Sequence, residues 1–377
     1  MKMREFGKLG IKGSAFGLGC MRFPMIEVDG KKVVDEEKAI KIIRTAIDGG
    51  VTYLDTAYVY LDQQSEIVVG KALQDGYREK CTIATKLPTW LVEKPEDMMK
   101  FFEEELQKLQ TDVIDFYLVH SLNRERWDNI KAMGVCDFLD KLKAEGRIRY
   151  ACFSFHDEYD SFEYILNDYD WDMAQIQYNY MDINNQAGTK GLKLAGEKGI
   201  PVVIMEGLLG GRLANAPDNV QALYDAFPVK RSPVEWAFRW LCNHPEVATV
   251  LSGVTTVEQT LDNLRIFDTV EAGCMDEAEL KLIDNVRDAY NSRIKVPCTG
   301  CAYCMPCPGG VDIPKSFAIW NNASLYGGLE KGNAEYARLE KDDKAPTKCL
   351  ECGACMANCP QSINIVEMLK CVTADLA

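Results

Sequence analysis

The chain has 377 residues, of which 47% are hydrophobic and 27% are charged, and its formal net charge is −14. This length and composition can support a sizeable core and predict one large domain with a smaller one. The acidic balance argues against nucleic acid as a partner, because proteins that bind nucleic acid present basic surfaces. No stretch has the apolar length of a signal peptide or a membrane-spanning helix, so we expect a cytoplasmic protein without membrane contact.

Most of the sequence, from about residue 15 to about residue 265, alternates short β-rich runs with helical patterns, which is typical of a parallel α/β fold. Before it, the segment MREFGKLGIKGSA predicts a β-hairpin, since glycines separate its short apolar pieces. The eight expected strands are Ala15–Leu18, Thr52–Leu54, Cys81–Thr85, Val113–Val119, Ile148–Phe153, Met173–Gln177, Pro201–Met205 and Thr249–Leu251. Expected helices with apolar residues three and four positions apart include Glu36–Asp48, Glu96–Leu109, Ile130–Lys143 and Val257–Arg265.

Eight β/α units in about 250 residues favour a (β/α)8 TIM barrel over a doubly wound sheet, and the hairpin would close the floor of that barrel. A Rossmann domain is not supported, because no G-x-G-x-x-G motif follows a strand. Gly17 and Gly19 are instead followed by Met21 and Arg22.

Four polar residues stand at the ends of three consecutive expected strands, where a TIM barrel carries its catalytic groups. They are Asp55, with Tyr60 just beyond it, then Lys86 and then His120. A tyrosine can deliver a proton to a carbonyl oxygen, and a nearby lysine cation favours the phenolate left behind. We expect Asp55 to hold Lys86, and His120 to hydrogen-bond the substrate oxygen. Taken singly, each residue has a structural alternative: a helix cap or turn, a solvated charge, or a packed histidine.

With these residues in place, the chain resembles the aldo/keto reductase family. The matching segments are GVTYLDTAYVY at 50–60, IATKLP at 83–88 and DFYLVHSL at 115–122, and the resemblance covers about residues 4 to 290. It implies an oxidoreductase that reduces a small carbonyl substrate by hydride transfer from NAD(P)H. Tyr60 would be the proton donor, assisted by Asp55, Lys86 and His120.

The resemblance also implies a nicotinamide cofactor across the barrel mouth. Ser154 and Gln175 match the positions that bind its carboxamide, and Met205 matches the position that stacks on the nicotinamide ring. The segment VLSGVTTVEQTLDNL at 250–264 matches the region around the adenine ribose. Its candidate residues are Gly253, Thr255, Gln259 and Asn263.

Two positions depart from the commoner family pattern: Phe155 follows Ser154 where asparagine is usual, and Met205 replaces an aromatic residue. Gln175 and Met205 have an alternative as barrel-filling residues. The ribose segment contains no arginine or lysine that would bind a 2′-phosphate, which favours NADH over NADPH.

After a further expected helix, Asp276–Tyr290, eight of the fifteen cysteines fall into two tight runs. The second run has the spacing of bacterial ferredoxins, and thiolates are the soft ligands that iron–sulfur clusters require. We therefore expect two [4Fe-4S] clusters, each held by three cysteines of one run and the last cysteine of the other. The sets are Cys298, Cys301, Cys304 with Cys359, and Cys349, Cys352, Cys355 with Cys307.

Structural zinc and disulfides are the alternatives to clusters, but a tetrahedral zinc usually takes its ligands from two knuckles separated by a long loop. The first run also departs from ferredoxin spacing, since two residues separate Cys304 from Cys307. This leaves the partner of Cys307 open. Cluster-type spacing without a signal peptide indicates a reducing cytosol, such as that of an anaerobe.

Helices are expected between the two runs, at Pro314–Leu325 and Asn333–Leu339. We place the barrel at residues 1–290 and a small, mostly helical ferredoxin-like domain at residues 291–377. The combination resembles the iron–sulfur branch of the aldo/keto reductase family.

The two halves use different electron chemistry, because a nicotinamide gives up two electrons as hydride whereas a cluster passes one electron at a time. The sequence contains no recognisable flavin motif to connect them. Three hypotheses follow: a carbonyl reductase with structural or regulatory clusters, an electron-transfer enzyme, and a non-catalytic protein built on a retained barrel. In the second, the clusters would relay electrons from a redox partner such as a ferredoxin to a substrate or flavin in the barrel.

Overall fold

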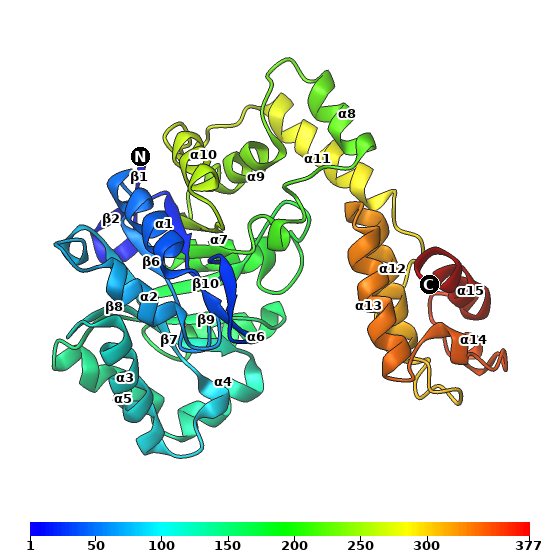
Figure 1. The fold of residues 1–377 in the computed structure, drawn as a ribbon, viewed down its shortest axis with the longest axis horizontal. Coiled ribbons are helices and arrows are strands. Elements are labelled where there is room, and N and C mark those ends of the chain that lie inside the picture. Colours follow the sequence, from blue (N-terminus) through cyan, green and yellow to red (C-terminus); the bar gives the residue numbers. More distant parts are fainter. The chain divides into compact units, whose positions relative to one another are not determined.

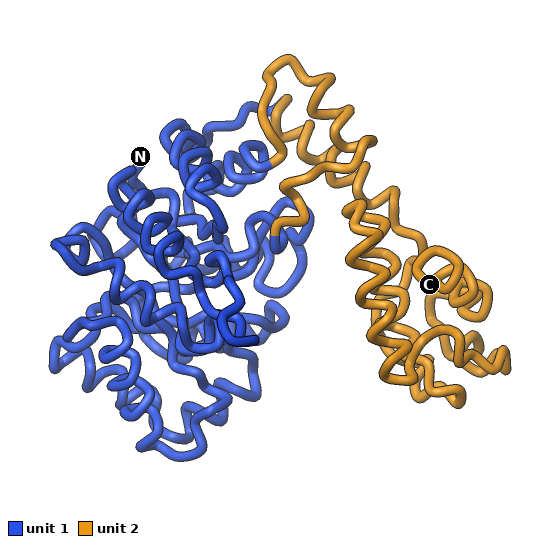
Figure 2. The backbone as a smooth tube through the Cα atoms, in the orientation of Figure 1, with its two compact units in different colours: residues 1–210, 234–277 blue, residues 211–233, 278–377 orange.

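The computed structural model describes residues 1–377, which form two compact units. One unit contains residues 1–210 and 234–277, and the other contains residues 211–233 and 278–377 (Figure 2). None of the helices combines the length and the hydropathy that crossing a bilayer requires.

The first unit is built around a closed barrel of eight parallel strands, drawn in blue to green in Figure 1. The strands are β3 (Phe16–Gly19), β6 (Tyr53–Asp55), β7 (Thr82–Leu87), β8 (Ile114–Leu122), β9 (Ile148–Phe155), β10 (Met173–Gln177), β11 (Val202–Met205) and β12 (Val247–Gly253). They follow one another around the barrel in chain order, and β12 pairs with β3 to close it. The predicted TIM barrel is confirmed, with expected strand ends displaced by at most three residues.

Helices follow the strands and cover the barrel. They are α1 (Glu36–Asp48), α2 (Ser65–Ala72), α3 (Pro95–Leu109), α4 (Arg124–Ala132), α5 (Val135–Ala144), α6 (Tyr159–Asn167), α7 (Gly188–Glu197), α9 (Pro233–Cys242) and α10 (Val257–Phe267). The single helix expected over Ile130–Lys143 is wrong, because the chain turns between α4 and α5. Gly134 there has φ of 86°, a left-handed value that an α-helix cannot contain.

The N-terminal hairpin is present as β1 (Met3–Glu5) and β2 (Lys12–Ser14), paired antiparallel. Its loop carries Phe6 into the barrel interior, where the ring packs against Tyr53 and Phe116. A side chain at Gly13 would place its Cβ 2.5 Å from the Phe6 ring, so only glycine fits there. The hairpin therefore closes the barrel floor, as predicted.

A second hairpin was not expected from the sequence. Its strands are β4 (Met25–Val28) and β5 (Lys31–Val34), and the turn between them is Asp29–Gly30 with φ values of 51° and 74°. Asp-Gly between two short β-rich runs is a strong hairpin signal, because both turn residues take positive φ. That signal was available in the sequence.

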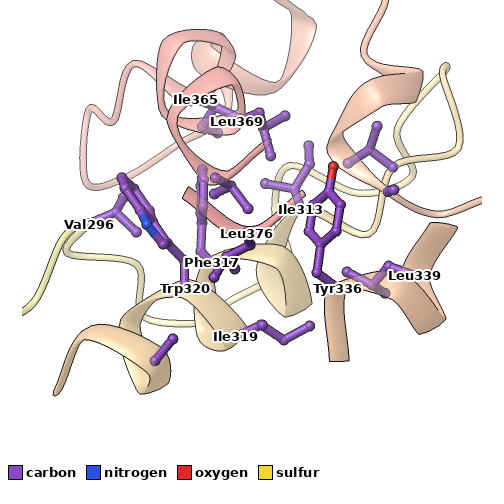
Figure 3. Packing of buried hydrophobic residues seen from close by; sticks show 14 of the residues in the cluster. Val296, Ile313, Phe317, Ile319, Trp320, Tyr336, Leu339, Ile365, Leu369 and Leu376 are labelled. Carbon is purple, nitrogen blue, oxygen red and sulfur yellow. The ribbon is translucent and has the colours of Figure 1, made fainter. Parts of the chain in front are cut away.

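The second unit is helical. It contains α8 (Asp218–Ala226), α11 (Glu277–Asn291), α12 (Ile313–Tyr326), α13 (Leu329–Lys341), α14 (Ala354–Ala357) and α15 (Ile365–Leu376). Side chains from α12, α13 and α15 meet in one core that includes Phe317, Trp320, Tyr336 and Leu369 (Figure 3). Six of the eight clustered cysteines pack against this core, so the core supports both cysteine-bearing loops.

Candidate active site

The four catalytic candidates lie at the carboxyl ends of adjacent strands, and three of them are in direct contact. Lys86 Nζ donates to Asp55 Oδ1 at 2.8 Å and lies 3.3 Å from the Tyr60 hydroxyl. A third bond, of 2.6 Å, goes to the backbone oxygen of Thr56. Lys86 and Asp55 are both buried, so the ion pair is shielded from water and fixes the ammonium group beside the phenol.

Burial and charge act in opposite directions on these groups. Burial raises the pKa of Tyr60, and the Lys86 cation opposes that rise. Burial is the largest effect on Lys86 and alone would lower its pKa, but the charges and hydrogen bonds of Asp55 and Tyr60 together raise it. Tyr60 is therefore a neutral phenol beside a permanent cation, the arrangement that a general acid needs.

His120 faces the same space. Its ring centroid lies 6.1 Å from that of Tyr60 and 5.0 Å from that of Trp90. Burial, with help from the Lys86 charge, lowers its pKa well below the ordinary value, and its buried Nδ1 has no hydrogen-bond partner. His120 is thus a neutral imidazole with an unused nitrogen.

Two of the expected carboxamide-binding residues lie next to this group. Gln175 donates from Nε2 to Asp55 Oδ2 at 3.1 Å, while its Oε1 is buried and unpartnered. Ser154 is buried, and its Oγ accepts from the backbone of Ser121 at 2.8 Å. Met205 ends β11 on the strand next to Gln177 and is half-buried. Gln175 therefore carries a free acceptor at the point where a ligand amide is expected.

The four ribose candidates separate into two groups. Thr255 and Gln259 are exposed, and Gln259 Oε1 accepts from both the backbone and the hydroxyl of Thr255. Asn263 is buried and donates to Ser252 Oγ at 3.0 Å, so it supports the strand end from behind. Gly253 is exposed at the end of β12.

Arg22 is a residue of this region that sequence reasoning missed. Its side chain lies along Gly253, where an added Cβ would stand 3.2 Å from Arg22 Cδ, and close to Gly210. The ribose segment itself supplies no cation, and Arg22 is 231 positions away from Gly253 in the chain. Only the closure of the barrel between β12 and β3 brings the two together.

The first cysteine set expected for a cluster lines one cavity of the helical unit. Cys298, Cys301, Cys304 and Cys359 surround it together with apolar side chains such as Phe317. The second set also gathers: after burial, the nearby sulfur atoms of Cys349, Cys307 and Cys352 contribute to the raised pKa of Cys355.

All fifteen cysteines are free thiols, so no disulfide competes for these ligands. No three His, Cys, Asp or Glu side chains converge closely enough for a single metal ion. A cubane cluster needs a wider ring of thiolates than one zinc ion, because each cysteine binds a different iron.

Comparison with known proteins identifies both parts of the chain. Residues 15–287 match the family model described as the aldo/keto reductase family. The chain belongs to the aldo/keto reductase family. Residues 297–363 of this aldo/keto reductase match the model of a 4Fe-4S dicluster domain.

Among similar proteins, YqkF of Bacillus subtilis (strain 168), an uncharacterised oxidoreductase, is 26% identical over 315 residues, which are 76% of this chain and 96% of YqkF. Probable aldo-keto reductase 1 of Glycine max is 32% identical over 154 residues, 39% of this chain and 42% of the relative.

Solved structures of the family superpose on the barrel. The holo form of AKR11C1 from Bacillus halodurans is 26% identical with a TM-score of 0.64, over 76% of this chain and 96% of that one. An aldo/keto reductase from Klebsiella pneumoniae, in complex with NADP and acetate, is 25% identical with a TM-score of 0.61. The match covers 76% of this chain and 95% of that one. This chain is therefore an aldo/keto reductase-type oxidoreductase with a joined iron–sulfur domain.

Proposed function

We propose that this protein reduces a small carbonyl compound by hydride transfer from NADH or NADPH, with Tyr60 as the proton donor. The observation that carries the proposal is the position of Lys86 Nζ, which contacts Asp55 at 2.8 Å and Tyr60 at 3.3 Å in a buried site. A cation fixed beside a neutral phenol stabilises the phenolate that proton transfer leaves behind.

The residues at the mouth of the barrel offer the hydrogen-bonding groups that a nicotinamide ring needs. The unpartnered Gln175 Oε1 can accept from a carboxamide N–H, and Ser154 lies nearby on the neighbouring strand. Arg22 offers a cation to the dinucleotide phosphates beside Gly253 and, together with Thr255 and Gln259, is the candidate set for the ribose end. When bound, the dinucleotide would supply hydride to the carbonyl carbon, and the Klebsiella relative's complex with NADP supports this cofactor class.

The chain's own residues carry the proton. Tyr60 would donate its hydroxyl proton to the carbonyl oxygen as the carbon accepts hydride, so that the product is an alcohol. Lys86 would stabilise the phenolate, Asp55 would hold Lys86 in place, and the neutral His120 would orient the carbonyl oxygen.

We further propose two [4Fe-4S] clusters in the helical part, one on each cysteine set, with a structural role. Support comes from the thiol-lined cavity and the dicluster family match. The functional boundary then lies at residues 290–291, with the barrel at 1–290 and the ferredoxin-like domain at 291–377. Cysteines without disulfides and thiolate-bound clusters both suit a reducing cytoplasm, as in an anaerobe.

Replacement of Tyr60 by phenylalanine tests the proposal. Tyr60→Phe should lower kcat for carbonyl reduction by about 100-fold or more while leaving cofactor affinity nearly unchanged, because the ring stays and only the proton donor is lost. Tyr58→Phe is the matched control, since the Tyr58 hydroxyl donates to Glu104 and makes no contact with the tetrad. Steady-state kinetics with fluorescence titration of the cofactor measure both quantities. Unchanged turnover in Tyr60→Phe would refute the assignment.

Electron transfer is the second candidate, favoured by the solvent exposure of Cys301 and Cys352, one in each cysteine set. Clusters with an exposed edge could exchange single electrons with a partner such as a ferredoxin. In that case the barrel would reduce its substrate with electrons from the clusters, through a flavin or directly.

A further inference from the structure

Arg126 is a half-buried cation without an acidic partner. Its NH1 group donates to the backbone oxygen and to the hydroxyl of Ser121, both at 2.9 Å, and no carboxylate pairs with it. Its Nε and NH2 groups donate to no protein atom. The contrast with Arg124 is clear, because Arg124 lies on the same helix turn, is exposed and reaches Asp128 at 3.5 Å. Carboxylates are abundant in this chain, whose net charge is −14, yet none neutralises Arg126. Because burying an unpaired charge is unfavourable for stability, a binding role would explain why an arginine stands here.

This cation lies at the edge of the catalytic space. The guanidinium carbon of Arg126 is 5.4 Å from the centre of the Trp90 ring, and Trp90 is 5.0 Å from the ring of His120. The charge of Arg126 also contributes to lowering the pKa of both His120 and His156. Arg126 is therefore about one aromatic ring away from the histidine that faces Tyr60.

The backbone around Arg126 is held in an unusual conformation. Ser121 follows His120 directly and has φ of 55°, where β8 loses its regular register with β9. This left-handed conformation is strained for a non-glycine residue, and such residues cluster at functional sites. The Ser154 hydroxyl holds Ser121 from one side and Arg126 holds it from the other, so the guanidinium is fixed in place before any ligand arrives.

We propose that Arg126 binds an anionic group, a carboxylate or a phosphate, on the carbonyl substrate and so selects anionic carbonyl compounds over neutral ones. A fixed guanidinium with free N–H groups matches the geometry of either anion. The carbonyl group would lie at Tyr60 and His120, and the anion would lie past Trp90. This inference names a substrate class for the proposed reduction and rests on it.

Paired substrates test the inference. ω-Oxo acids of three to six carbons are compared with the unsubstituted aldehydes of the same length, and glyceraldehyde 3-phosphate is compared with glyceraldehyde. The wild type should favour the anionic member of at least one pair by about 10- to 100-fold in kcat/KM, and the pair that shows it identifies the anion. Arg126→Gln should abolish that preference by raising KM for the anion, with kcat for the neutral aldehyde nearly unchanged. Arg126→Lys should restore part of it.

Arg124→Gln is the matched control, because it removes the same charge from the same helix turn at an exposed position and should leave the preference intact. A merely structural Arg126 would give a different result: Arg126→Gln would slow the anionic and the neutral substrate by the same factor. That outcome, or a wild type without preference in any pair, would overturn the inference.

A binding measurement separates this inference from the proposed function. Calorimetric titration with butanoate and with inorganic phosphate needs no turnover. Binding to the wild type and to Arg124→Gln, but not to Arg126→Gln, would support the anion site even if none of the aldehydes were reduced. Equal or absent binding in all three proteins would refute it, whatever the enzyme reduces.

Discussion

Tyr60, the proposed acid, has two neighbours with opposite charges. Burial of the phenol, which is the largest effect, and the Asp55 carboxylate both disfavour the phenolate, whereas the Lys86 cation favours it; the pKa of Tyr60 stays raised. Asp55 is itself hydrogen-bonded to Lys86 and Gln175. Its main role is therefore to hold Lys86 in place beside Tyr60. The net effect is a proton donor that is stable in the resting enzyme and becomes a stabilised phenolate only on reaction.

This electrostatic balance predicts the pH dependence of kcat. Tyr60 must carry its proton, and its pKa lies above the ordinary 10.0, so activity should fall on the alkaline side only above about pH 10. The pKa of His120 lies well below its ordinary 6.5, so no acidic limb should appear near pH 6.5. Stopped-flow measurement of the hydride-transfer step across pH 6 to 10 should therefore give a flat profile. A decline centred near pH 7 or 8 would contradict a neutral phenol as the donor.

The catalytic candidates could be predicted from the sequence because Asp55, Lys86 and His120 stand at strand ends, which meet at one rim of a barrel, and Tyr60 follows shortly after Asp55. Their contacts could not be predicted, since the 2.8 Å and 3.3 Å distances from Lys86 depend on side-chain conformation. Arg22 and Arg126 escaped notice because neither stands in a motif. Arg22 stands out because it lies beside Gly253, which is distant in sequence. Arg126 stands out because no carboxylate pairs with it and because it lies near Trp90.

At the scale of the elements, two acidic side chains are buried where α2 and α3 pack on the barrel. Glu66 and Glu105 are both fully buried. Glu66 accepts from Thr85 at 2.5 Å and reaches Lys108 at 3.5 Å, whereas Glu105 forms no ion pair and has the Tyr117 hydroxyl as its neighbour. Burial raises the pKa of Glu105 well above its ordinary value, and the charge of Glu66 raises it further. Glu105 therefore binds its proton more tightly in the folded protein than in the unfolded chain.

The sign of its effect on stability follows from this raised pKa. The folded state holds the Glu105 proton more tightly than the unfolded state. The contribution of this group to the unfolding free energy is therefore complete below the unfolded pKa and is lost as pH rises through the folded pKa. Glu105→Gln stays neutral at every pH. Its advantage in unfolding free energy over the wild type should grow with pH and reach roughly 1–3 kcal/mol at alkaline pH.

Urea unfolding followed by tryptophan fluorescence between pH 5 and pH 9 measures this difference, and five of the six tryptophans lie in the barrel part. Glu103→Gln is the control on the same helix, because Glu103 is partly exposed and pairs with Arg147 at the surface. A constant gap between Glu105→Gln and the wild type at all pH values would show that Glu105 is ionised in the folded protein.

Strands were easier to predict than the breaks between helices. Apolar β-branched runs bounded by turn residues mark buried parallel strands, and all eight were found within three residues of their ends. The pattern over Ile130–Lys143 keeps its helical spacing across Met133 and Gly134, so periodicity alone could not reveal the turn. Only the left-handed φ of Gly134 separates α4 from α5.

The whole molecule combines an aldo/keto reductase barrel with a helical part that matches a 4Fe-4S dicluster domain. The two cysteine-bearing loops have their own supporting core, which includes Phe317, Trp320 and Leu369 and against which several of the cysteines pack. The sequence predicted this helical organisation from the long connection between Cys307 and Cys349. The grouping of Cys298, Cys301 and Cys304 with Cys359 around one cavity also agrees with the set expected from the spacing, whereas the apolar side chains that complete this lining could not be read from the sequence.

Iron analysis tests the cysteine assignment. The anaerobically purified protein should bind about eight irons and about eight acid-labile sulfides per chain. Cys359→Ser should lose one cluster and retain about four irons, since it removes one ligand of the first set. Cys371→Ser should keep the full complement, because Cys371 packs against the same core but belongs to neither set. Stoichiometric zinc without sulfide would rule out clusters.

The central claim is that substrate reduction occurs by hydride transfer in the barrel. Anaerobic turnover with NADH or NADPH deuterated at the transferred position of the nicotinamide C4 tests it most directly, with the product analysed by mass spectrometry or NMR. Hydride transfer predicts one deuterium on the former carbonyl carbon and cluster absorbance that stays constant throughout. An unlabelled product, formed while the clusters bleach and recover, would show that single electrons pass through the clusters and that the barrel does not work as a reductase of this type.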